Sequence, residues 1–563
     1  MRLHLPRMKF VPANERPNQV CWFEPCDSVL DCGSPLPLSR QARNRRLDAG
    51  SRFWINTCFQ SGRGLPQSKT WRKSVVQWCV RASPVFFLGL LGSILLAGGG
   101  DSLAADSLVL TQTPVTPPSG APARTILDQR YPNGSRVVLM APPYRTNTAR
   151  VLSAGLTAAG GPVVYPDGNH ILFVGKTSVA DAWQVYLTTA KGGRPKPLTA
   201  MTEGAMDPAV IANGDFVFSS PVPKVGEVWK TDKPAALYAK KPGMPPRQLT
   251  FGTYSAVEPT VLRDGRILFI SAHPAADSVK IPSLGLFTIN NDGTEVTAFA
   301  LDRDEVSRVH RPRELENGEL GFVATTHDEK AAPKWAEAVR MARPFASRSQ
   351  LFAFPTGSCL SVEPDGPEAL LACFETRGMS GRSMRGSYAV FCVNPDAKEL
   401  GRPLFDDPAW HDIEAVRLTT RSEPMGHVSA IVPSKPIGTI LCLNASSTRP
   451  GASNTVPSAK VGRVRVLART VDNQERVLGE ITVQRDGSFM ATVPAETPIG
   501  FETLDDQGHV AQRLAPSIWL RRGENRSCLG CHEPYNRAPR NVRPIAAGLP
   551  AVNLGDRTTV AGQ

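Results

Sequence analysis

The sequence predicts an all-β protein in which a β-propeller precedes a small antiparallel β-sandwich-like domain and a short tail. Three observations support this prediction: the composition, a repeat of about fifty residues, and a change of pattern after residue 433. With 563 residues, the chain exceeds what one hydrophobic core fills, so several domains are expected. Its 47 glycines and 50 prolines favour many turns between short strands over long helices.

The repeat lies between residues 160 and 400. Each unit holds a glycine-centred turn followed by a short run of aliphatic and aromatic residues. Asn-Gly and Asp-Gly supply the positive φ angles that tight turns need. The turn glycines are spaced by 46, 51, 53 and 48 residues: Gly168, Gly214, Gly265, Gly318 and Gly366. This period predicts propeller blades of WD or Tol type. Residues 124–156 and 415–420 are expected to close a sixth blade, within a propeller over 106–435.

The pattern after the propeller predicts a second domain over residues 436–520. Residues 463–468 and 499–504 read as short strands, the first alternating polar and apolar side chains as half-buried strands do. The turn at Asp486–Gly487 joins two more runs of this kind. About eighty residues of short antiparallel strands indicate a sandwich-like domain. Residues 521–563 then form a separate tail.

The most apolar run of the chain covers residues 84–98 and follows a basic stretch. A basic region, a short apolar run and small residues at 102–105 are typical of a secretory signal, here over 72–105. Residues 1–70 are expected to be disordered or to precede the true translation start. We expect a periplasmic or otherwise exported protein, and membrane attachment only if residues 84–99 stay as an uncleaved anchor.

The net charge of +13 does not indicate a nucleic-acid partner. Residues 1–105 carry +8 of it, and the remaining chain carries only +5 without a basic stripe. No Ser/His/Asp triad, phosphate loop or paired-carboxylate motif stands out either.

The chemistry of the tail centres on Cys528, Leu529, Gly530, Cys531 and His532. Cys-x-x-Cys-His is the attachment pattern of c-type haem, in which two thiols bond the vinyl groups and the histidine binds the iron. A zinc half-site would need two further ligands, and no Cys or His follows His532. A thioredoxin-like pair would need a βαβ setting. The sequence therefore predicts one covalent haem c.

The other histidines and cysteines of the propeller give weaker signals. We expect hydrogen-bonded structural roles for the histidines, with His273 and His310 slightly better candidates for function: His170, His273, His310, His327, His411 and His427. Cys359 and Cys373 flank the turn at Gly366 and either pair or remain buried thiols. No spacing argument links Cys392 with Cys442.

Residues 486–535 resemble a known family. The segments 486–489, 493–505 and 522–524, with Trp519 and residues 528–534, are similar to the middle domain of hydrazine synthase alpha subunits. The resemblance implies a propeller followed by a haem-bearing middle domain. Members that make hydrazine carry a further C-terminal domain with a second haem. This chain ends 31 residues after His532 and has one such motif, so we expect a relative with a different or reduced task.

The resemblance also implies an alternative iron ligand. In hydrazine-making members the motif histidine binds zinc, and a tyrosine about one turn later binds the iron. Tyr535 is the candidate here, although His532 remains the expected axial ligand. The prediction is an exported haem redox protein that serves electron transfer or small-molecule chemistry, with small nitrogen compounds as possible substrates and a redox partner protein. The alternative is a propeller binding module with a structural haem or metal.

Overall fold

The computed structural model describes residues 106–116, 125–222, 235–273, 283–300, 308–325, 335–344, 347, 349–352, 358–376, 386–397, 399–447, 461–470, 474–530 and 541–555. The predicted leader and signal run at 1–105 lie outside these ranges, as do Cys531, His532 and Tyr535. Within the described ranges, no helix has the length and apolar character needed to cross a membrane.

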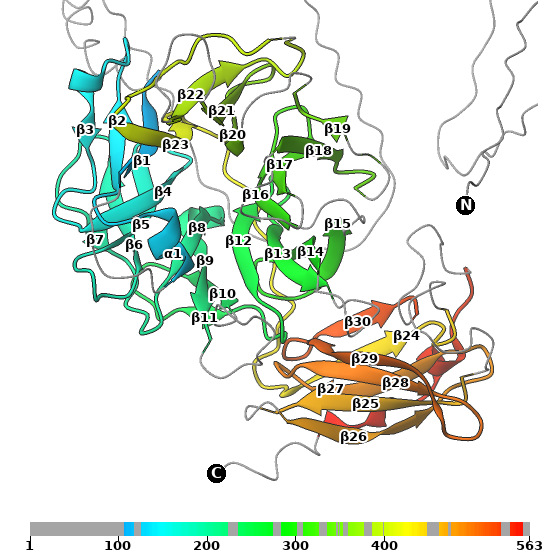
Figure 1. Cartoon of the computed structure of the whole chain (residues 1–563). Coiled ribbons are helices and arrows are strands. Elements are labelled where there is room, and N and C mark those ends of the chain that lie inside the picture. The colour runs from blue at the N-terminus through cyan, green and yellow to red at the C-terminus, as the bar shows by residue number, and fades with distance from the viewer. Residues whose placement is uncertain are drawn as a thin grey trace, which may run out of the picture. The chain divides into compact units, whose positions relative to one another are not determined.

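The described residues between 106 and 417 form six sheets of antiparallel neighbours (Figure 1). The closing sheet has the order β23 (Trp410–Arg417), β1 (Leu108–Pro114), β2 (Arg136–Met140), β3 (Arg150–Val151). The other five follow in chain order: β4 (Ala158–Val164), β5 (His170–Lys176), β6 (Gln184–Thr189), β7 (Lys196–Pro197); β8 (Met206–Val210), β9 (Phe216–Pro221), β10 (Ala235–Lys240), β11 (Arg247–Gln248); β12 (Ala256–Val261), β13 (Ile267–His273), β14 (Ser283–Ile289), β15 (Thr297–Ala300); β16 (Arg308–Glu314), β17 (Glu319–Thr325), β18 (Trp335–Arg340), β19 (Ser349–Gln350); and β20 (Cys359–Pro364), β21 (Leu370–Glu375), β22 (Tyr388–Val393).

The sheets form a closed ring. Strand β4 contacts β8, and the contacts continue through β12, β16, β20 and β23 back to β4. Strand β23 closes this ring by pairing with β1, from Leu108 opposite Arg417 to Pro114 opposite Trp410. The region is a β-propeller, and its closing strand spans Trp410–Arg417 rather than the predicted 415–420, with β1 as a partner ahead of the predicted 124–156.

The five predicted turn glycines all lie between the first and second strands of their sheets. Their φ angles run from 67° at Gly168 to 101° at Gly366, a region that side chains with a Cβ rarely adopt. At Gly265 a Cβ would also lie 2.1 Å from the backbone oxygen of Met425. Sequence spacing thus located the turns because glycine adopts this backbone far more readily than other residues.

The second domain is a sandwich of two sheets around one apolar core. One sheet has the order β26 (Glu475–Thr482), β25 (Arg463–Arg469), β28 (Ile499–Leu504), β29 (Val510–Ile518). The other has the order β30 (Asn525–Cys528), β24 (Ile437–Cys442), β27 (Phe489–Pro494), β31 (Val552–Asn553). Ile440, Val464, Phe489 and Phe501 are among the side chains buried between them. The sequence predicted antiparallel strands over 436–520 and a separate tail over 521–563, but β30 and β31 of that tail join the sandwich in parallel.

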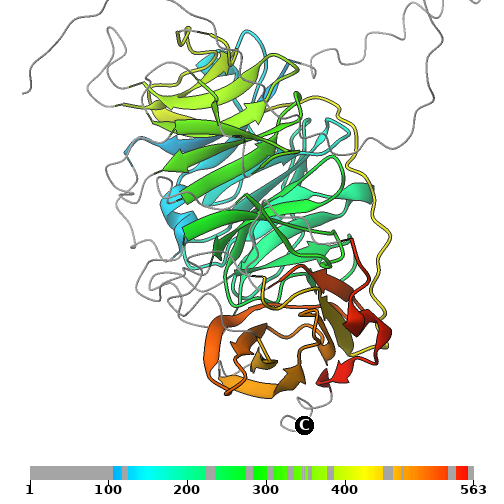
Figure 2. The same cartoon turned by 90° about the vertical axis from the view of Figure 1, so that its right-hand side faces the viewer.

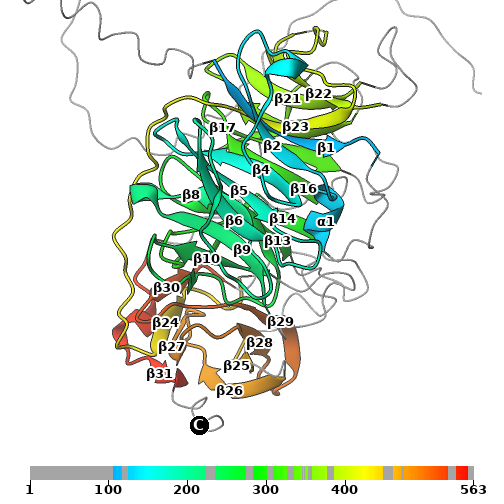
Figure 3. The same ribbon diagram turned by 90° about the vertical axis from the view of Figure 1, so that its left-hand side faces the viewer.

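Two connecting segments lie on opposite faces of the propeller. The linker 418–436 runs along one face (Figure 2) and is held there by hydrogen bonds from Arg421 N to Pro166 O and from Met425 N to Arg263 O. The short helix α1 (Ile126–Arg130) lies on the other face (Figure 3). A capping box between Thr125 and Asp128 starts α1. The remaining helical turns are η1 (Thr146–Thr148), η2 (Ala212–Gly214) and η3 (Ile545–Gly548).

Candidate functional site

Cys528 is the one predicted haem-attachment residue within the described ranges. It ends β30, where its partner in the parallel register is Cys442 on β24. The N–H of Leu443 donates to the carbonyl of Cys528 at 2.9 Å. The side chain of Cys528 is half-buried and packs against the core of the sandwich. The first motif cysteine is therefore positioned by a regular strand of the second domain.

Gly530 stands between the two motif cysteines and is tightly enclosed. A Cβ at this position would lie 2.4 Å from the backbone oxygen of Ser447 and 3.1 Å from that of Asn444. Backbone atoms cannot move aside as a flexible side chain can. The motif therefore needs glycine here, and the loop after β24 fixes the chain between the cysteines.

Glu524 anchors the segment that precedes the motif. Its buried carboxylate accepts the N–H of Arg521 at 2.6 Å, the guanidinium of Arg526 at 3.0 Å and the N–H of Glu295 at 3.0 Å. Glu295 belongs to the propeller, just before β15. The family-like triplet at 522–524 thus contributes a carboxylate that ties the motif-bearing chain to the propeller.

Further contacts strengthen this anchor. The Arg521 guanidinium lies 4.9 Å from the centre of the Phe251 ring and donates to the carbonyl of Gln248 at 3.1 Å. Burial lowers the pKa of Arg521, although the carboxylate of Glu496 opposes the shift. Thr253 donates its hydroxyl to the carbonyl of Pro516 at 2.8 Å. Residues 248–253 and the loop before β15 therefore hold residues 516–526 against the propeller.

Two buried donors beside this anchor have no partner among the described residues. They are the indole Nε1 of Trp519 and the Nε of Arg521. Buried donors are usually met by ordered water or a bound acceptor, and an orphaned donor costs about 1–3 kcal/mol. Trp519 packs within an apolar cluster of the propeller, and the Nε of Arg521 would lie 3.2 Å from a Cβ at Gly293, so both donors lie at the contact with the propeller. The described residues contain no cluster of three His, Cys, Asp or Glu side chains that could hold a metal ion.

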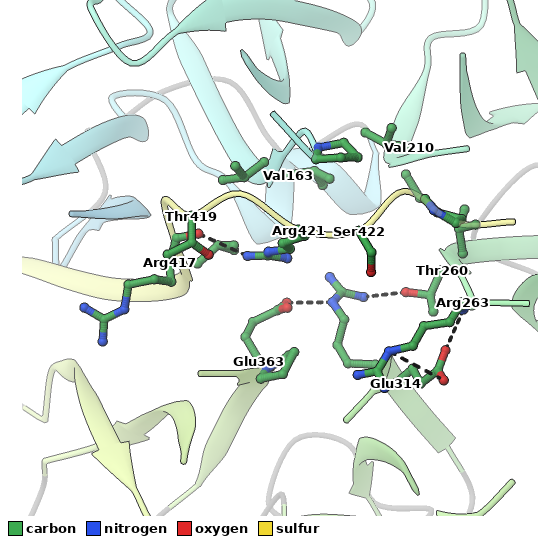
Figure 4. Close-up of a pocket in the computed structure, with 18 of the residues that line it drawn as sticks. Val163, Val210, Thr260, Arg263, Glu314, Glu363, Arg417, Thr419, Arg421 and Ser422 are labelled. Atoms are coloured by element: carbon green, nitrogen blue, oxygen red, sulfur yellow. Dashed lines mark hydrogen bonds and ion pairs between the residues drawn. The ribbon is translucent and has the colours of Figure 1, made fainter. Parts of the chain in front are cut away.

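A second candidate site is a cavity of about 890 Å³ on the linker face of the propeller (Figure 4). All six innermost strands contribute to its wall, and residues 419–424 of the linker cross it. Arginines and acids of the wall pair with each other: Arg313 with Glu363 at 2.7 Å, Arg417 with Asp365 at 2.6 Å, and Arg263 with Glu316 at 2.9 Å.

Arg421 differs from the other arginines of the cavity. Its Nη2 donates to the carbonyl of Arg417 at 3.0 Å, and no carboxylate of the described residues forms an ion pair with it. The side chain is exposed to the cavity, and desolvation by the surrounding protein lowers its pKa despite the carboxylate of Glu363 nearby. The cavity therefore offers a guanidinium with several unused donors.

The channel below the cavity is filled by charged residues that sequence reasoning missed. Each lies at a β-bulge of an innermost strand, where the φ angle is positive: 50° at Asp207, 49° at Glu258, 52° at Arg311 and 57° at Glu414. Non-glycine residues in this region store strain and often mark functional positions. We call these four residues, with Arg130 and Tyr131 from the end of α1, the central ionic cluster.

The cluster is connected by hydrogen bonds and ion pairs, and the N–H of Arg311 donates to Glu258 at 2.6 Å, which joins its two halves. Arg130 bonds Asp207 at 2.7 Å and Glu258 at 2.8 Å. Glu414 accepts the hydroxyl of Tyr131 at 2.7 Å and contacts the guanidinium of Arg311. His310 places its Nδ1 3.5 Å from Glu258.

Ionisation within the cluster follows from these contacts. Burial alone would raise the pKa of Glu414, but Arg311 and Arg130 outweigh it and hold that pKa below its usual range. Burial likewise opposes ionisation of Glu258, whose pKa the hydrogen bond from His310 and the charge of Arg130 bring well below normal. Burial raises the pKa of Asp207 despite Arg130.

A sequence signal for the cluster existed. In four units, the residue seven positions before the turn glycine is followed by proline: Gly161, Asp207, Glu258 and Arg311. Gly161 also has a positive φ, of 66°. In these four units the repeat therefore marks one position that faces the channel. The residue at that position is neutral, acidic or basic depending on the unit.

The weaker histidine and cysteine predictions have mixed outcomes. His170 bonds Asp167 within its own turn, and His411 Nδ1 accepts the N–H of Tyr388 at 3.3 Å, so both have the structural roles expected. His327 lies outside the described residues.

Cys373 and Cys392 are free thiols, so neither the Cys359–Cys373 nor the Cys392–Cys442 pair forms in this structure. Cys373 lies opposite Ser361 rather than Cys359, because a bulge shifts the register.

The motif-bearing domain matches a known family. The hydrazine synthase alpha subunit middle domain matches residues 440–533. The structure is similar to that of hydrazine synthase from Kuenenia stuttgartiensis, with a TM-score of 0.67 and 17% identity over 79% of this chain and 71% of that one. This chain is similar to hydrazine synthase in fold. Its order of a propeller before a sandwich-like domain is therefore the fold shared with that enzyme.

Other comparisons add little to this result. TolB from Acinetobacter baumannii matches with a TM-score of 0.37 and 12% identity over 56% of this chain and 66% of that one. No curated protein matches the chain.

Proposed function

We propose that the chain is an exported c-type cytochrome of the hydrazine synthase alpha-like type. Cys528 and Cys531 attach one haem through thioethers, and His532 is its axial ligand. The observation that carries this proposal is the position of the motif, because residues 528–532 fall inside the matched middle domain at 440–533.

A bound haem would supply an iron that gains and loses one electron or binds a small molecule. The chain's own residues position the attachment point. Glu524 and Arg521 join the segment to the propeller, while β30 places Cys528 against the sandwich. The close approach of Ser447 to Gly530 fixes the path between the two cysteines. Such rigid placement suits a redox site, which benefits from a fixed environment.

Tyr535 is the alternative iron ligand, with His532 then free to bind zinc. A phenolate ligand donates charge and would lower the iron potential. The family likeness points to small nitrogen compounds as substrates, and a redox partner protein would deliver or accept the electrons. Ligation by Tyr535 would give a high-spin ferric spectrum, and Tyr535→Phe would then change that spectrum where His532 ligation predicts no change.

The test of the cytochrome is a pyridine haemochrome spectrum of the chain matured with haem-attachment machinery. Wild type is expected to show a covalent c-type band, and the Cys528→Ala/Cys531→Ala variant is expected to lose it. Cys373→Ala is the matched control, since that thiol is buried in the propeller. A wild-type chain without covalent haem would overturn the proposal.

A second function is favoured by the unpaired guanidinium in the cavity. We propose that the propeller binds a small organic anion whose carboxylate meets Arg421. A volume of about 890 Å³ falls within the range of small-molecule sites. A charge-assisted hydrogen bond contributes about 1.5–3 kcal/mol, so Arg421→Gln is expected to weaken binding at least about tenfold.

Calorimetry with succinate and with inorganic phosphate tests this second function. Arg266→Gln is the control, because Arg266 is exposed, pairs with Asp264 and does not line the cavity. Equal affinities for the two variants, or no binding by wild type, would contradict it.

A further inference from the structure

Two cysteines lie side by side at the attachment site. Cys442 and Cys528 are register partners on the parallel strands β24 and β30. Neighbouring strands are about 4.7–4.9 Å apart, and disulfides span Cα distances of about 4.4–6.8 Å. Register partners also direct their side chains to the same face of a sheet. The backbone therefore brings the two thiols within bonding reach.

Both thiols face the sandwich core. Cys442 is 1% exposed and belongs to the core with Ile440 and Phe489, and Cys528 packs against the same set of side chains. On β24, Leu441 is more exposed than the adjacent Cys442, and on β30, Ser527 is more exposed than the adjacent Cys528. This is the alternation that a strand produces. The thiols thus share one face and one apolar environment.

The register between the strands is held at both ends. The N–H of Thr439 donates to the carbonyl of Glu524 at 2.8 Å, and the N–H of Leu443 donates to that of Cys528 at 2.9 Å. The carboxylate of Glu524 is in turn fixed to the propeller through Glu295. A slip that would separate Cys442 from Cys528 would break this anchor.

We propose that Cys442 and Cys528 form a disulfide in the haem-free chain, which withholds Cys528 from haem attachment until the bond is reduced. This inference rests on the proposed cytochrome function, and no role for Cys442 follows from the Cys-x-x-Cys-His motif. Oxidation forms the S–S bond as the two thiols give two electrons and two protons to a disulfide oxidant, which becomes two thiols. A dithiol reductant reverses the step. The Cys528 S–H then adds across a haem vinyl group, forming a C–S bond with no net oxidation.

Burial determines how this bond is opened. Cys528 is partly exposed while Cys442 is buried, so we expect a reductant to attack the Cys528 sulfur and Cys442 to leave as a thiolate. An apolar environment disfavours a thiolate, and a poor leaving group slows thiol–disulfide exchange. Reduction is therefore expected to be at least tenfold slower than for an exposed disulfide such as oxidised glutathione.

The test uses the full chain produced without haem-attachment machinery and incubated with oxidised glutathione. After remaining thiols are alkylated, non-reducing proteolysis and mass spectrometry identify the linked peptides. A dominant Cys442–Cys528 link is the expected result, lost in Cys442→Ala and kept in the control Cys373→Ala. A dominant Cys528–Cys531 link, or alkylated Cys442 in wild type, would overturn the proposal.

A second measurement separates this inference from the cytochrome proposal. With attachment machinery present and reductant limiting, Cys442→Ala is expected to gain covalent haem several-fold faster than wild type. Equal rates would overturn the gating role even if the disulfide forms. If no variant attaches haem, the cytochrome proposal fails and the gating role fails with it, while the peptide links still decide whether the two cysteines pair.

Discussion

The propeller channel and the motif-bearing segment differ in how their buried charged groups are assembled. The central ionic cluster draws one residue from each of several repeats, and three carboxylates and two guanidinium groups share it, with Glu258 and Glu414 the most buried of them. The segment 519–530 instead relies on one buried carboxylate, Glu524, that accepts three donors within a few residues and one propeller loop. The first site is formed by equivalent positions of several repeats, whereas the second is formed by one short segment.

This difference shows how each region tolerates change. A cluster assembled from separate strands fails when one partner is removed, because the remaining charge stays buried without compensation. A local anchor loses its contacts but leaves the strands on either side intact. The variants below test this contrast in order of expected effect.

Arg311→Met is expected to destabilise the chain most, by about 3–5 kcal/mol, because it leaves the Glu414 carboxylate without its guanidinium. Chemical denaturation followed by intrinsic fluorescence measures the change. Arg340→Met is the control, since its side chain is 73% exposed, and it should alter the free energy of unfolding by less than about 1 kcal/mol. Similar losses in both variants would show that the cluster contributes no special stability.

The pH dependence of stability tests another buried carboxyl of the closing sheet. Burial raises the pKa of Asp412 to about 7, although Asp407 N and Gln112 donate hydrogen bonds to it. A raised pKa means that the folded chain binds the proton more tightly than the unfolded chain. Stability from this group is therefore present at pH 4 and declines by about 3 kcal/mol as the pH rises to 7.

Asp412→Asn removes this titration while keeping the shape of the side chain. Denaturation curves at pH 4, 5.5 and 7 are expected to show a smaller fall in stability for the variant than for wild type over this interval. Parallel pH profiles would show that Asp412 titrates near its ordinary value.

Glu524→Ala removes the acceptor for Arg521, Arg526 and Glu295 and is expected to cost about 2–3 kcal/mol. Limited proteolysis should also cut near residue 520 faster than in wild type. The matched change Glu480→Ala removes a half-exposed carboxylate paired with two arginines and should cost at most about 1 kcal/mol. An equal cost for the two variants would mean that Glu524 is an ordinary surface ion pair.

Gly530→Ala is expected to have the smallest effect on stability, about 1–2 kcal/mol, because its Cβ would meet the backbone of Ser447. The more sensitive readout is the yield of covalent haem per chain, which should fall several-fold. Gly548→Ala places its Cβ in open space and should leave the yield unchanged. An unchanged yield in Gly530→Ala would show that the path between the cysteines need not be fixed.

Local chemistry in the sequence determined the blades and the motif. The turn glycines revealed the repeat because each must adopt a positive φ, and the run near residue 415 indicated the closing strand because a ring needs one. Cysteine spacing alone predicted Cys528 as an attachment residue. These features depend on a few neighbouring residues, so they are visible without a structure.

Tertiary structure alone decided which distant residues meet. Tyr131 and Glu414 bond across 283 positions, and the bulges that direct Asp207, Glu258 and Arg311 into the channel depend on strand pairing rather than on local propensity. The parallel pairing of β30 with β24 sets Cys442 beside Cys528, although they are 86 positions apart in the chain. The proline after Asp207, Glu258 and Arg311 marks these positions in the sequence, but the closure of the sheets decides which partners they meet.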